Sequence, residues 1–271
     1  MRYSVVAYEL TVEWEFGVRG LVGRTALVTG GGSGIGRAIA LRLAHEQMPV
    51  GILDINAESA AKVAGEIKAA GGTAVFERCD ITNYADVQAA ITAVEAKQGP
   101  TQVLVNNAGW DIPMPFLQTT LDFWKKVVDL NFYGPMHVTH AVAKGMAERS
   151  FGRIIFIASD AGRVGSSGEA VYSGCKGGTI AFAKTLAREL SRKNVLINTI
   201  CPGPTNTPAM AAAMAGDSGK KIMDALVRSV PLGRIGDPDD YAGLAAFLAS
   251  DDGAYMTGQT ISVSGGLTMH G

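Results

Sequence analysis

The chain has 271 residues, of which 47% are hydrophobic, and its formal net charge is -1. This length suits one large α/β domain or two small ones, with enough apolar residues for a sizeable core. A near-neutral chain lacks the basic character of proteins that bind nucleic acid or membrane surfaces. There is no run of about 18 apolar residues, so no transmembrane helix is expected. The three cysteines lack metal-ligand spacing and indicate reduced thiols in a cytoplasmic protein.

The first twenty residues carry three glutamates and no continuous apolar stretch, which does not suit a signal peptide. We therefore expect residues 1–20 to form an N-terminal extension and residues 21–271 to form one domain. The extension can be an over-long assigned start, a packing arm or a partly ordered tail, and the sequence does not choose among these.

Short apolar segments alternate with longer amphipathic segments along the rest of the chain. In chain order, the pattern predicts a strand at 24–29, a helix at 34–47, a strand at 50–54, a helix at 57–70, a strand at 73–79, a helix at 83–98, a strand at 102–105, a long helix or broken pair at 119–148, a strand at 153–158, a helix at 170–191, a strand at 194–201, a mobile helical segment at 205–228, a helix at 238–250 and a strand at 259–263. The irregularity within 119–148 is expected near Gly134 and Pro135. Such alternation predicts an α/β protein: a single-domain, doubly wound Rossmann fold with a seven-stranded parallel sheet.

A glycine-rich turn follows the first predicted strand and opens the first predicted helix. Its sequence, TGGGSGIG, allows a tight bend and a close approach of the backbone to a pyrophosphate, which the helix N-terminus then attracts. The alternative is a turn without a ligand. The predicted cofactor contacts here are Gly30, Ser33, Gly34, Ile35 and Gly36.

Asp54 ends the second predicted strand, where a carboxylate can accept hydrogen bonds from ribose hydroxyls and repel a 2′-phosphate. No Arg or Lys stands at Ser33 or Ile55 to compensate, so the expected cofactor is NAD rather than NADP. The alternative is that Asp54 caps the next helix. Further contacts with the cofactor are predicted after the third and fourth strands, at Asp80, Ile81, Asn107, Ala108 and Gly109.

Tyr172 and Lys176 stand four residues apart, so on one helix they share a face. A lysine ammonium at roughly 5 Å favours the phenolate by roughly 3 kcal/mol, or about two pK units. We therefore expect a lowered pKa for Tyr172 and a role as general acid/base. Ser159, at the end of the preceding strand, can hold a substrate oxygen beside the phenol. The alternative is an ordinary amphipathic helix face.

Together with Asn131 and the segment PGP from residue 202, these motifs resemble the short-chain dehydrogenase/reductase family over residues 21–271. The resemblance implies hydride transfer at a secondary alcohol or ketone with NAD(H), in a homotetramer. It implies that Tyr172 is the acid/base, that Lys176 binds the nicotinamide ribose and that Ser159 orients the substrate oxygen. It also implies that Asn131 holds a water in a proton relay. The remaining implied cofactor contacts are Ile55, Tyr172, Pro202, Gly203 and Thr205.

A narrower likeness, to 2-hydroxycyclohexanecarboxyl-CoA dehydrogenases of aromatic-acid degradation, rests on the segments NNAGWD, IASDAGRVGSSGEAVY, CPGPTNT and SVSGGLTMHG. It predicts NAD-dependent oxidation of a cyclic 2-hydroxyacyl-CoA. Substrate contacts are expected at Ser159, Trp110, Arg163 and Met210. Alternatively, Trp110 only packs and Arg163 is a surface charge.

The segment 205–228 suits a long acyl-CoA, because flexible methionines alternate with cations. These residues are Met210, Met214, Met223, Lys220, Lys221 and Arg228. The alternative is an amphipathic helix with a solvated basic edge.

Two other functions are open. One is a 3-oxoacyl-thioester (acyl-carrier-protein) reductase, which uses the same acid/base residues but which Asp54 disfavours if NADPH is required. The other is a non-catalytic NAD-binding sensor or scaffold, which would not need Tyr172 and Lys176. No metal site is expected, because His137 and His140 have no acidic or cysteine partner nearby in the sequence.

Overall fold

The computed structural model describes residues 17–213 and 217–269. Its centre is a seven-stranded sheet in the order β3-β2-β1-β4-β5-β6-β7, and every neighbouring pair of strands is parallel. The strands are β1 (Ala26–Thr29), β2 (Val50–Asp54), β3 (Ala74–Arg78), β4 (Val103–Asn106), β5 (Gly152–Ile157), β6 (Val195–Pro202) and β7 (Thr260–Val263). The predicted fold class is confirmed.

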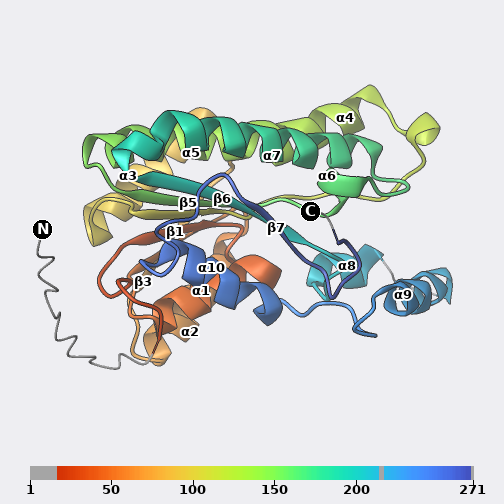
Figure 1. Ribbon diagram of the computed structural model, residues 1–271, viewed down its shortest axis with the longest axis horizontal. Helices are drawn as coiled ribbons and strands as arrows, with labels where there is room; N and C mark the ends of the chain where they lie inside the picture. The colour runs from red at the N-terminus through yellow and green to blue at the C-terminus, as the bar shows by residue number, and fades with distance from the viewer. Residues whose placement is uncertain (1–16, 214–216, 270–271) are drawn as a thin grey trace, which may run out of the picture.

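Helices cover both faces of the sheet (Figure 1). Helices α1 (Gly34–His45), α2 (Ala57–Ala69) and α10 (Asp239–Ala249) lie on one face, and α3 (Tyr84–Gln98), α5 (Gly134–Glu148) and α7 (Ala170–Leu190) lie on the other. The shorter helices are α4 (Leu121–Val128), α6 (Ala161–Val164), α8 (Pro208–Ala213) and α9 (Asp217–Ser229).

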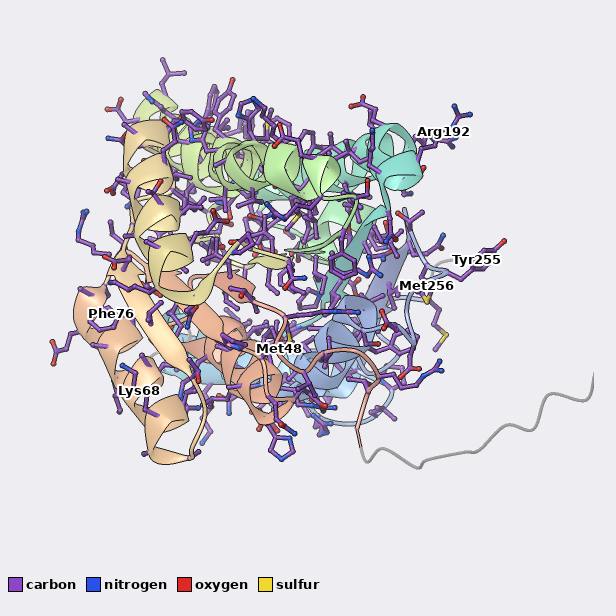
Figure 2. All side chains as sticks on the ribbon, turned by 90° about the vertical axis from the view of Figure 1, so that its left-hand side faces the viewer. Met48, Lys68, Phe76, Arg192, Tyr255 and Met256 are labelled. Atoms are coloured by element: carbon purple, nitrogen blue, oxygen red, sulfur yellow. The ribbon has the colours of Figure 1, made fainter. Side chains whose placement is uncertain are left out.

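The sheet separates two apolar clusters, which explains why its strands are continuous apolar runs. Neighbouring residues of a strand point to opposite faces, so Ile52 packs with α1, α2 and α10 while Leu53 packs with α3, α5 and α7. Met48, just before β2, is 1% exposed, whereas Tyr255 projects outward (Figure 2).

The long helical segment after β4 is interrupted, so the second predicted alternative, a broken pair of helices, is confirmed. A π-helical turn, Asp129–Tyr133, joins α4 to α5. The break precedes Gly134 and Pro135, and Pro135 stands in the first turn of α5, where its missing N–H costs no hydrogen bond. Asn131 is therefore placed by an irregular turn, and such turns often occur at functional sites.

Of the predicted extension, only residues 17–20 are described; residues 1–16 lie outside the described part of the chain. Arg19 pairs with Asp252 at 2.6 Å, and its carbonyl accepts a hydrogen bond from the Asp251 N–H at 2.9 Å. Leu21 is buried in the core. The boundary at residue 21 stays a prediction.

The segment that contains α8 and α9 leaves and rejoins the domain at one place. Thr205 forms an isolated parallel bridge with Gly236, and its hydroxyl lies 2.5 Å from the Tyr241 hydroxyl on α10. The predicted helical character of residues 205–228 is confirmed by α8 and α9, although Met214 lies outside the described residues. No helix in the described ranges is both long and apolar enough to cross a membrane.

Candidate active site

The predicted site residues gather at the carboxyl ends of the parallel strands. Between β1 and β4 the strand order reverses its direction, so the helices that follow these two strands lie on opposite faces and leave a crevice between them. Turns after β1, β2, β4, β5 and β6 all meet this edge. The shared location that the sequence pattern predicts is therefore present.

The glycine-rich turn after β1 is bent at Gly30 and Gly34, whose φ angles of 61° and 51° lie in the left-handed region. Gly36 permits its close packing, because a Cβ there would lie 2.2 Å from the Gly30 carbonyl oxygen. Ser33 precedes α1 without capping it through its side chain, so the first N–H groups of the helix remain available. They adjoin a groove of about 590 Å³ that Ser33, Gly34 and Pro208 help to line. This arrangement suits a phosphate group.

Asn107 supports that turn from the end of β4. Its side-chain amide donates to the carbonyl oxygens of Thr29 and Gly30, both at 3.1 Å. In return, the Thr29 hydroxyl accepts hydrogen bonds from the main-chain N–H groups of Asn107 and Ala108. The Asn107 side chain is thus engaged with the turn, and a cofactor contact of Asn107 stays a prediction.

Asp54 binds the same turn from the end of β2. One carboxylate oxygen accepts from the Gly32 N–H at 2.9 Å, and the other accepts from the Asn56 N–H at 2.9 Å. Asn56, not Asp54, caps α2, so the alternative reading of Asp54 as the helix cap is wrong. Arg37, which also lines the groove, pairs with Glu66 at 2.6 Å. Each carboxylate oxygen of Asp54 has a second lone pair for a ribose hydroxyl.

Asp80 and Ile81 follow β3. The Asp80 carboxylate accepts hydrogen bonds from the Thr82 N–H at 2.9 Å and the Thr82 hydroxyl at 2.7 Å. Ile81 is buried, and Gly134 leaves room for its side chain, because a Cβ at Gly134 would lie 2.5 Å from Ile81 Cδ1. Both residues hold local structure, and their contact with an adenine stays a prediction.

Tyr172 and Lys176 share one face of α7, as their spacing predicts. Lys176 Nζ lies 5.4 Å from the centre of the Tyr172 ring and donates to the Ile157 carbonyl oxygen at 3.0 Å. Ser159, two residues after the end of β5, hydrogen-bonds the Tyr172 phenol. The Ser159 oxygen also accepts from the Ala161 N–H at 3.1 Å, which fixes its position. The three side chains therefore converge.

The expected direction of the Tyr172 pKa is wrong. Burial raises the pKa of the phenol and the Glu169 carboxylate raises it further, while the hydrogen bond with Ser159 lowers it. Burial also lowers the pKa of Lys176 to about 8, so its ammonium is still mostly protonated at pH 7. Desolvation of the phenolate thus outweighs the attraction between the phenolate and the ammonium that the spacing suggests.

Asn131 is fully buried beside these residues. A Cβ at Gly109 would lie 2.8 Å from Asn131 Oδ1 and 3.4 Å from Lys176 Nζ, so the turn after β4 touches both residues. The Asn131 carbonyl oxygen accepts from the Thr179 hydroxyl at 3.4 Å. A water bound at Asn131 stays a prediction.

In the turn after β6, Thr205, one of the expected cofactor contacts, forms hydrogen bonds within the protein. The Thr205 hydroxyl is buried and bonds Gly203 O at 2.8 Å and the Tyr241 hydroxyl. Thr207 instead comes next to the glycine-rich turn, since a Cβ at Gly34 would lie 3.4 Å from Thr207 Cγ2. Thr207 is not among the site residues predicted from the sequence, although it lies in the segment CPGPTNT. Contacts of Pro202, Gly203 and Thr205 with a cofactor stay predictions.

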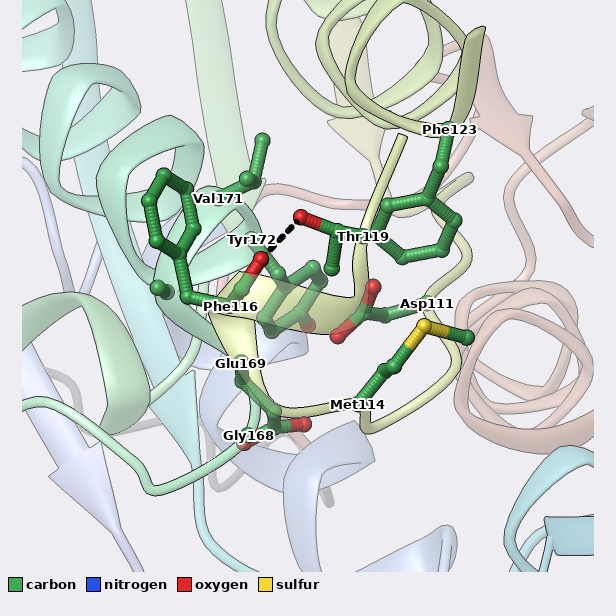
Figure 3. Close-up of a pocket in the computed structure, with 10 residues that line it drawn as sticks. Asp111, Met114, Phe116, Thr119, Phe123, Gly168, Glu169, Val171 and Tyr172 are labelled. Atoms are coloured by element: carbon green, nitrogen blue, oxygen red, sulfur yellow. Dashed lines mark hydrogen bonds between the residues drawn. The ribbon is translucent and has the colours of Figure 1, made fainter. Parts of the chain in front are cut away.

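A narrow cavity lies beside Tyr172 (Figure 3), and its walls pack too closely to leave room for a water molecule. Its walls are mostly apolar but include the two acidic side chains of Asp111 and Glu169. The residues that line it are Asp111, Met114, Phe116, Thr119, Phe123, Gly168, Glu169, Ala170, Val171 and Tyr172. Neither Asp111 nor Glu169 is among the site residues predicted from the sequence. The one signal was that Asp111 follows Trp110 in the segment NNAGWD.

None of the residues predicted to contact substrate lines this cavity, although Ser159 bonds Tyr172, which does. The Trp110 ring packs under Lys126 Nζ at 3.9 Å, which agrees with the alternative that it only packs. Arg163 donates to the Ser262 hydroxyl on β7 at 2.7 Å. Met210 lies in α8. Within the described ranges, no group of three or more His, Cys, Asp or Glu side chains comes together to hold a metal.

The chain is similar in sequence to known reductases. A family described as Enoyl-(Acyl carrier protein) reductase matches residues 30–268. The acetoacetyl-CoA reductase of Shinella zoogloeoides is 40% identical over 243 residues, which are 90% of this chain and 98% of the relative. The 3-oxoacyl-[acyl-carrier-protein] reductase MabA of Mycobacterium tuberculosis is 37% identical over 248 residues, 92% of this chain and 94% of the relative.

Solved structures give the same result. Levodione reductase superposes with a TM-score of 0.87 at 29% identity, covering 90% of this chain and 97% of that chain. A variant of actinorhodin polyketide ketoreductase, solved with NADPH, has a TM-score of 0.86 at 35% identity and covers 92% of this chain and 98% of that chain.

Proposed function

The chain belongs to the short-chain dehydrogenase/reductase family and is an oxidoreductase of CH–OH and C=O groups, and we propose that it reduces 3-oxoacyl thioesters with NADH. The observation that carries this proposal is the Ser159–Tyr172 pair at the edge of a mostly apolar cavity. Such a pair can hold a carbonyl oxygen, and the apolar walls would surround an acyl chain once they move apart to admit it.

The residues present fit a nicotinamide dinucleotide. The uncapped N-terminus of α1 and the groove beside it suit the pyrophosphate, and Asp54 suits the adenosine ribose. Lys176 uses one of its three N–H donors on Ile157, which leaves two for the hydroxyls of the second ribose. When bound, the nicotinamide supplies the hydride that reduces the carbonyl carbon.

The protein supplies the proton and the orientation. The Ser159 hydroxyl donates a hydrogen bond to the carbonyl oxygen, and the Tyr172 phenol donates its proton to the same oxygen as negative charge develops there. The raised pKa keeps Tyr172 protonated at neutral pH, which is the form that reduction requires. This favours a reductase over the alcohol oxidation by a phenolate that we expected from the sequence.

The relatives also change the expected substrate. They are named as reductases of acetoacetyl-CoA and of 3-oxoacyl acyl carrier protein, so the cyclic 2-hydroxyacyl-CoA and the link to aromatic-acid degradation are replaced by the alternative reading. The proposed substrate is therefore a 3-oxoacyl thioester, whether of CoA or of acyl carrier protein. The role of α9 in binding CoA and the homotetramer stay predictions.

NADH rather than NADPH is proposed because of Asp54. A 2′-phosphate on the ribose would meet this carboxylate, and the cation that lines the groove, Arg37, is already paired with Glu66. One similar ketoreductase was solved with NADPH, so the choice between NADH and NADPH calls for a direct kinetic test.

The test is initial-rate kinetics of the purified protein with NADH and NADPH against acetoacetyl-CoA, a 3-oxoacyl acyl carrier protein and free acetoacetate. We expect a higher kcat/KM with NADH and with the thioesters. Tyr172→Phe should lose about 100-fold or more in kcat, since it lacks the general acid, and should still bind NADH. Equal kcat/KM for acetoacetate and its thioesters would refute the thioester assignment, and near-normal turnover by Tyr172→Phe would refute the mechanism.

A further inference from the structure

Asp111 is an acidic residue on the turn after β4, and it lines the same cavity as Tyr172. Figure 3 shows its carboxyl group directed toward Tyr172, with Met114 and Phe123 nearby. The two groups are close enough that the Asp111 charge helps to raise the pKa of Tyr172. Asp111 is thus beside the proposed reaction centre rather than on the outer surface.

One oxygen of this carboxyl group has nothing to bind. Among the described residues, Asp111 Oδ2 is buried from solvent and has no hydrogen-bond partner. The pKa of Asp111 is raised to about 6, mainly by burial and to a smaller extent by the Glu169 charge, against the lowering effect of a hydrogen bond from the Ile112 N–H. The group is therefore mostly ionised at pH 7. A buried acceptor without a donor is costly, and an ionised one more so.

We propose that Asp111 determines specificity by accepting a hydrogen bond from an N–H or O–H group of the substrate other than the reduced carbonyl. The inference rests on the proposed function and refines its substrate class. In a 3-oxoacyl thioester such a donor has two sources: an amide N–H of the pantetheine arm, or a hydroxyl group carried further along the acyl chain. Either would satisfy Oδ2 once the closely packed, mainly apolar walls beside it move apart to admit the substrate.

The charges around the cavity agree with this choice of ligand. Glu169 stands before α7 in the same lining, and Tyr172 and Cys175 are the titratable groups on α7 that interact with Asp111. A substrate carboxylate would meet two acidic groups, whereas a neutral donor would gain a charged acceptor. Asp111 thereby favours a neutral thioester over a free acid.

The experiment compares pairs of substrates that differ by one donor. The first pair is the N-acetylcysteamine thioester of acetoacetate and its S-4-oxopentyl analogue, in which a methylene replaces the N–H. The second pair is the 5-hydroxy-3-oxohexanoyl and 3-oxohexanoyl S-4-oxopentyl thioesters. The kcat/KM ratio within each pair is measured for the wild type, Asp111→Ala, Asp111→Asn and Glu169→Gln.

We expect the wild type to prefer the donor in one pair by about tenfold, a ratio typical of a hydrogen bond to a charged acceptor, and that pair identifies the source. Asp111→Ala should reduce the ratio to about twofold or less, because the acceptor is gone, while donor-free substrates keep their kcat/KM within about threefold. Asp111→Asn, which keeps the shape but not the charge, should give a lower ratio than the wild type. Glu169→Gln should keep the wild-type ratio.

Wild-type ratios near one in both pairs would overturn the inference without any variant. So would a ratio that Asp111→Ala retains, a ratio that is lost only in Glu169→Gln, or an equal loss on all four substrates, which indicates a structural role. If Asp111→Ala does not fold, an unchanged ratio in Asp111→Asn would count against the inference in the same way. Failure of the wild type to reduce any thioester would instead refute the proposed function.

Discussion

The side-chain amide of Asn131 and the main chain of Trp110 bind each other in both directions. Asn131 Nδ2 donates to the Trp110 carbonyl oxygen at 2.7 Å, and the Trp110 N–H donates to Asn131 Oδ1 at 3.2 Å. Nδ2 also donates to the Val127 carbonyl oxygen at 2.9 Å. The π-helical turn and the turn after β4 are thereby held as one unit, next to Lys176.

Asn131→Ala should therefore destabilise the protein as well as impair catalysis. It leaves the N–H and the carbonyl oxygen of Trp110 without their partner in a buried setting, and we expect a loss of about 2–4 kcal/mol in the free energy of unfolding. Urea denaturation followed by circular dichroism measures it. A loss below about 1 kcal/mol would mean that Asn131 does not hold this turn.

Lys176 should set the alkaline limb of the pH profile. Its pKa is lowered to about 8 by burial, against smaller opposing effects of Cys175 and Cys201, so the ammonium loses its proton as pH rises through about 8. Tyr172 stays protonated over this range. We expect kcat/KM for reduction to fall above about pH 8, and Lys176→Met to lose that inflection along with most activity. An inflection at the same pH in Lys176→Met would assign it to another group.

Asp54→Asn should move the cofactor preference toward NADPH. Asparagine keeps an acceptor for one of the two N–H groups that Asp54 binds but removes the charge that meets a 2′-phosphate. We expect the ratio of kcat/KM for NADPH over NADH to rise about tenfold, which corresponds to about 1.4 kcal/mol. Asp80→Asn, at the end of the neighbouring strand, is the control and should leave the ratio unchanged. An unchanged ratio of kcat/KM for NADPH over NADH in Asp54→Asn would show that Asp54 does not determine the cofactor preference.

Two glycine substitutions should have opposite effects on stability. A Cβ at Gly36 would lie 2.2 Å from the Gly30 carbonyl oxygen and 2.4 Å from Asn107 Nδ2, so Gly36→Ala should cost about 2–3 kcal/mol as the turn is displaced. Gly65 lies in α2, and a Cβ there would have no neighbouring atom within 4 Å, so Gly65→Ala should stabilise by about 0.5–1 kcal/mol. Thermal melting compares the two, and similar melting temperatures would contradict the packing argument.

Asp111 should lower the stability of the free enzyme at neutral pH. Its pKa rises from 3.8 to about 6 on folding, so the carboxyl group favours the folded state most when it is protonated, below about pH 4. This contribution to the free energy of unfolding is lost as pH rises through about 6. After discounting for its partial exposure, we expect Asp111→Asn to be more stable than the wild type by about 1 kcal/mol at pH 8. The difference should vanish at pH 4. A constant difference across this range would show that the charge of Asp111 is not its cause.

The sequence predicts what depends on local pattern. Apolar runs such as 50–54 become buried strands, and the spacing of Tyr172 and Lys176 places both on one face of α7. Both results follow from the periodicity of strands and helices, which neighbouring residues determine.

What the sequence could not give depends on contacts between distant residues. The pKa of Tyr172 follows from burial, and Asp111 meets Glu169 only because the turn after β4 lies against the start of α7. Arg163, which is expected at the substrate, donates a hydrogen bond to Ser262, 99 residues further along the chain. No local pattern indicates such pairs.

The bridge between Thr205 and Gly236 means that the chain departs from the sheet and comes back to it at neighbouring points. The residues between these two points, which include α8 and α9, form an insertion. The bridge joins its two ends, and the Thr205 hydroxyl also bonds Tyr241 of α10. Residues 206–235 can thus be exchanged as a cassette with those of a related reductase, leaving the floor of the crevice in place. Because Thr207 lies next to the glycine-rich turn and Pro208 lines the groove beside α1, a chimaera built at these two positions is expected to change how the cofactor is held and to leave the lining of the cavity beside Tyr172 intact.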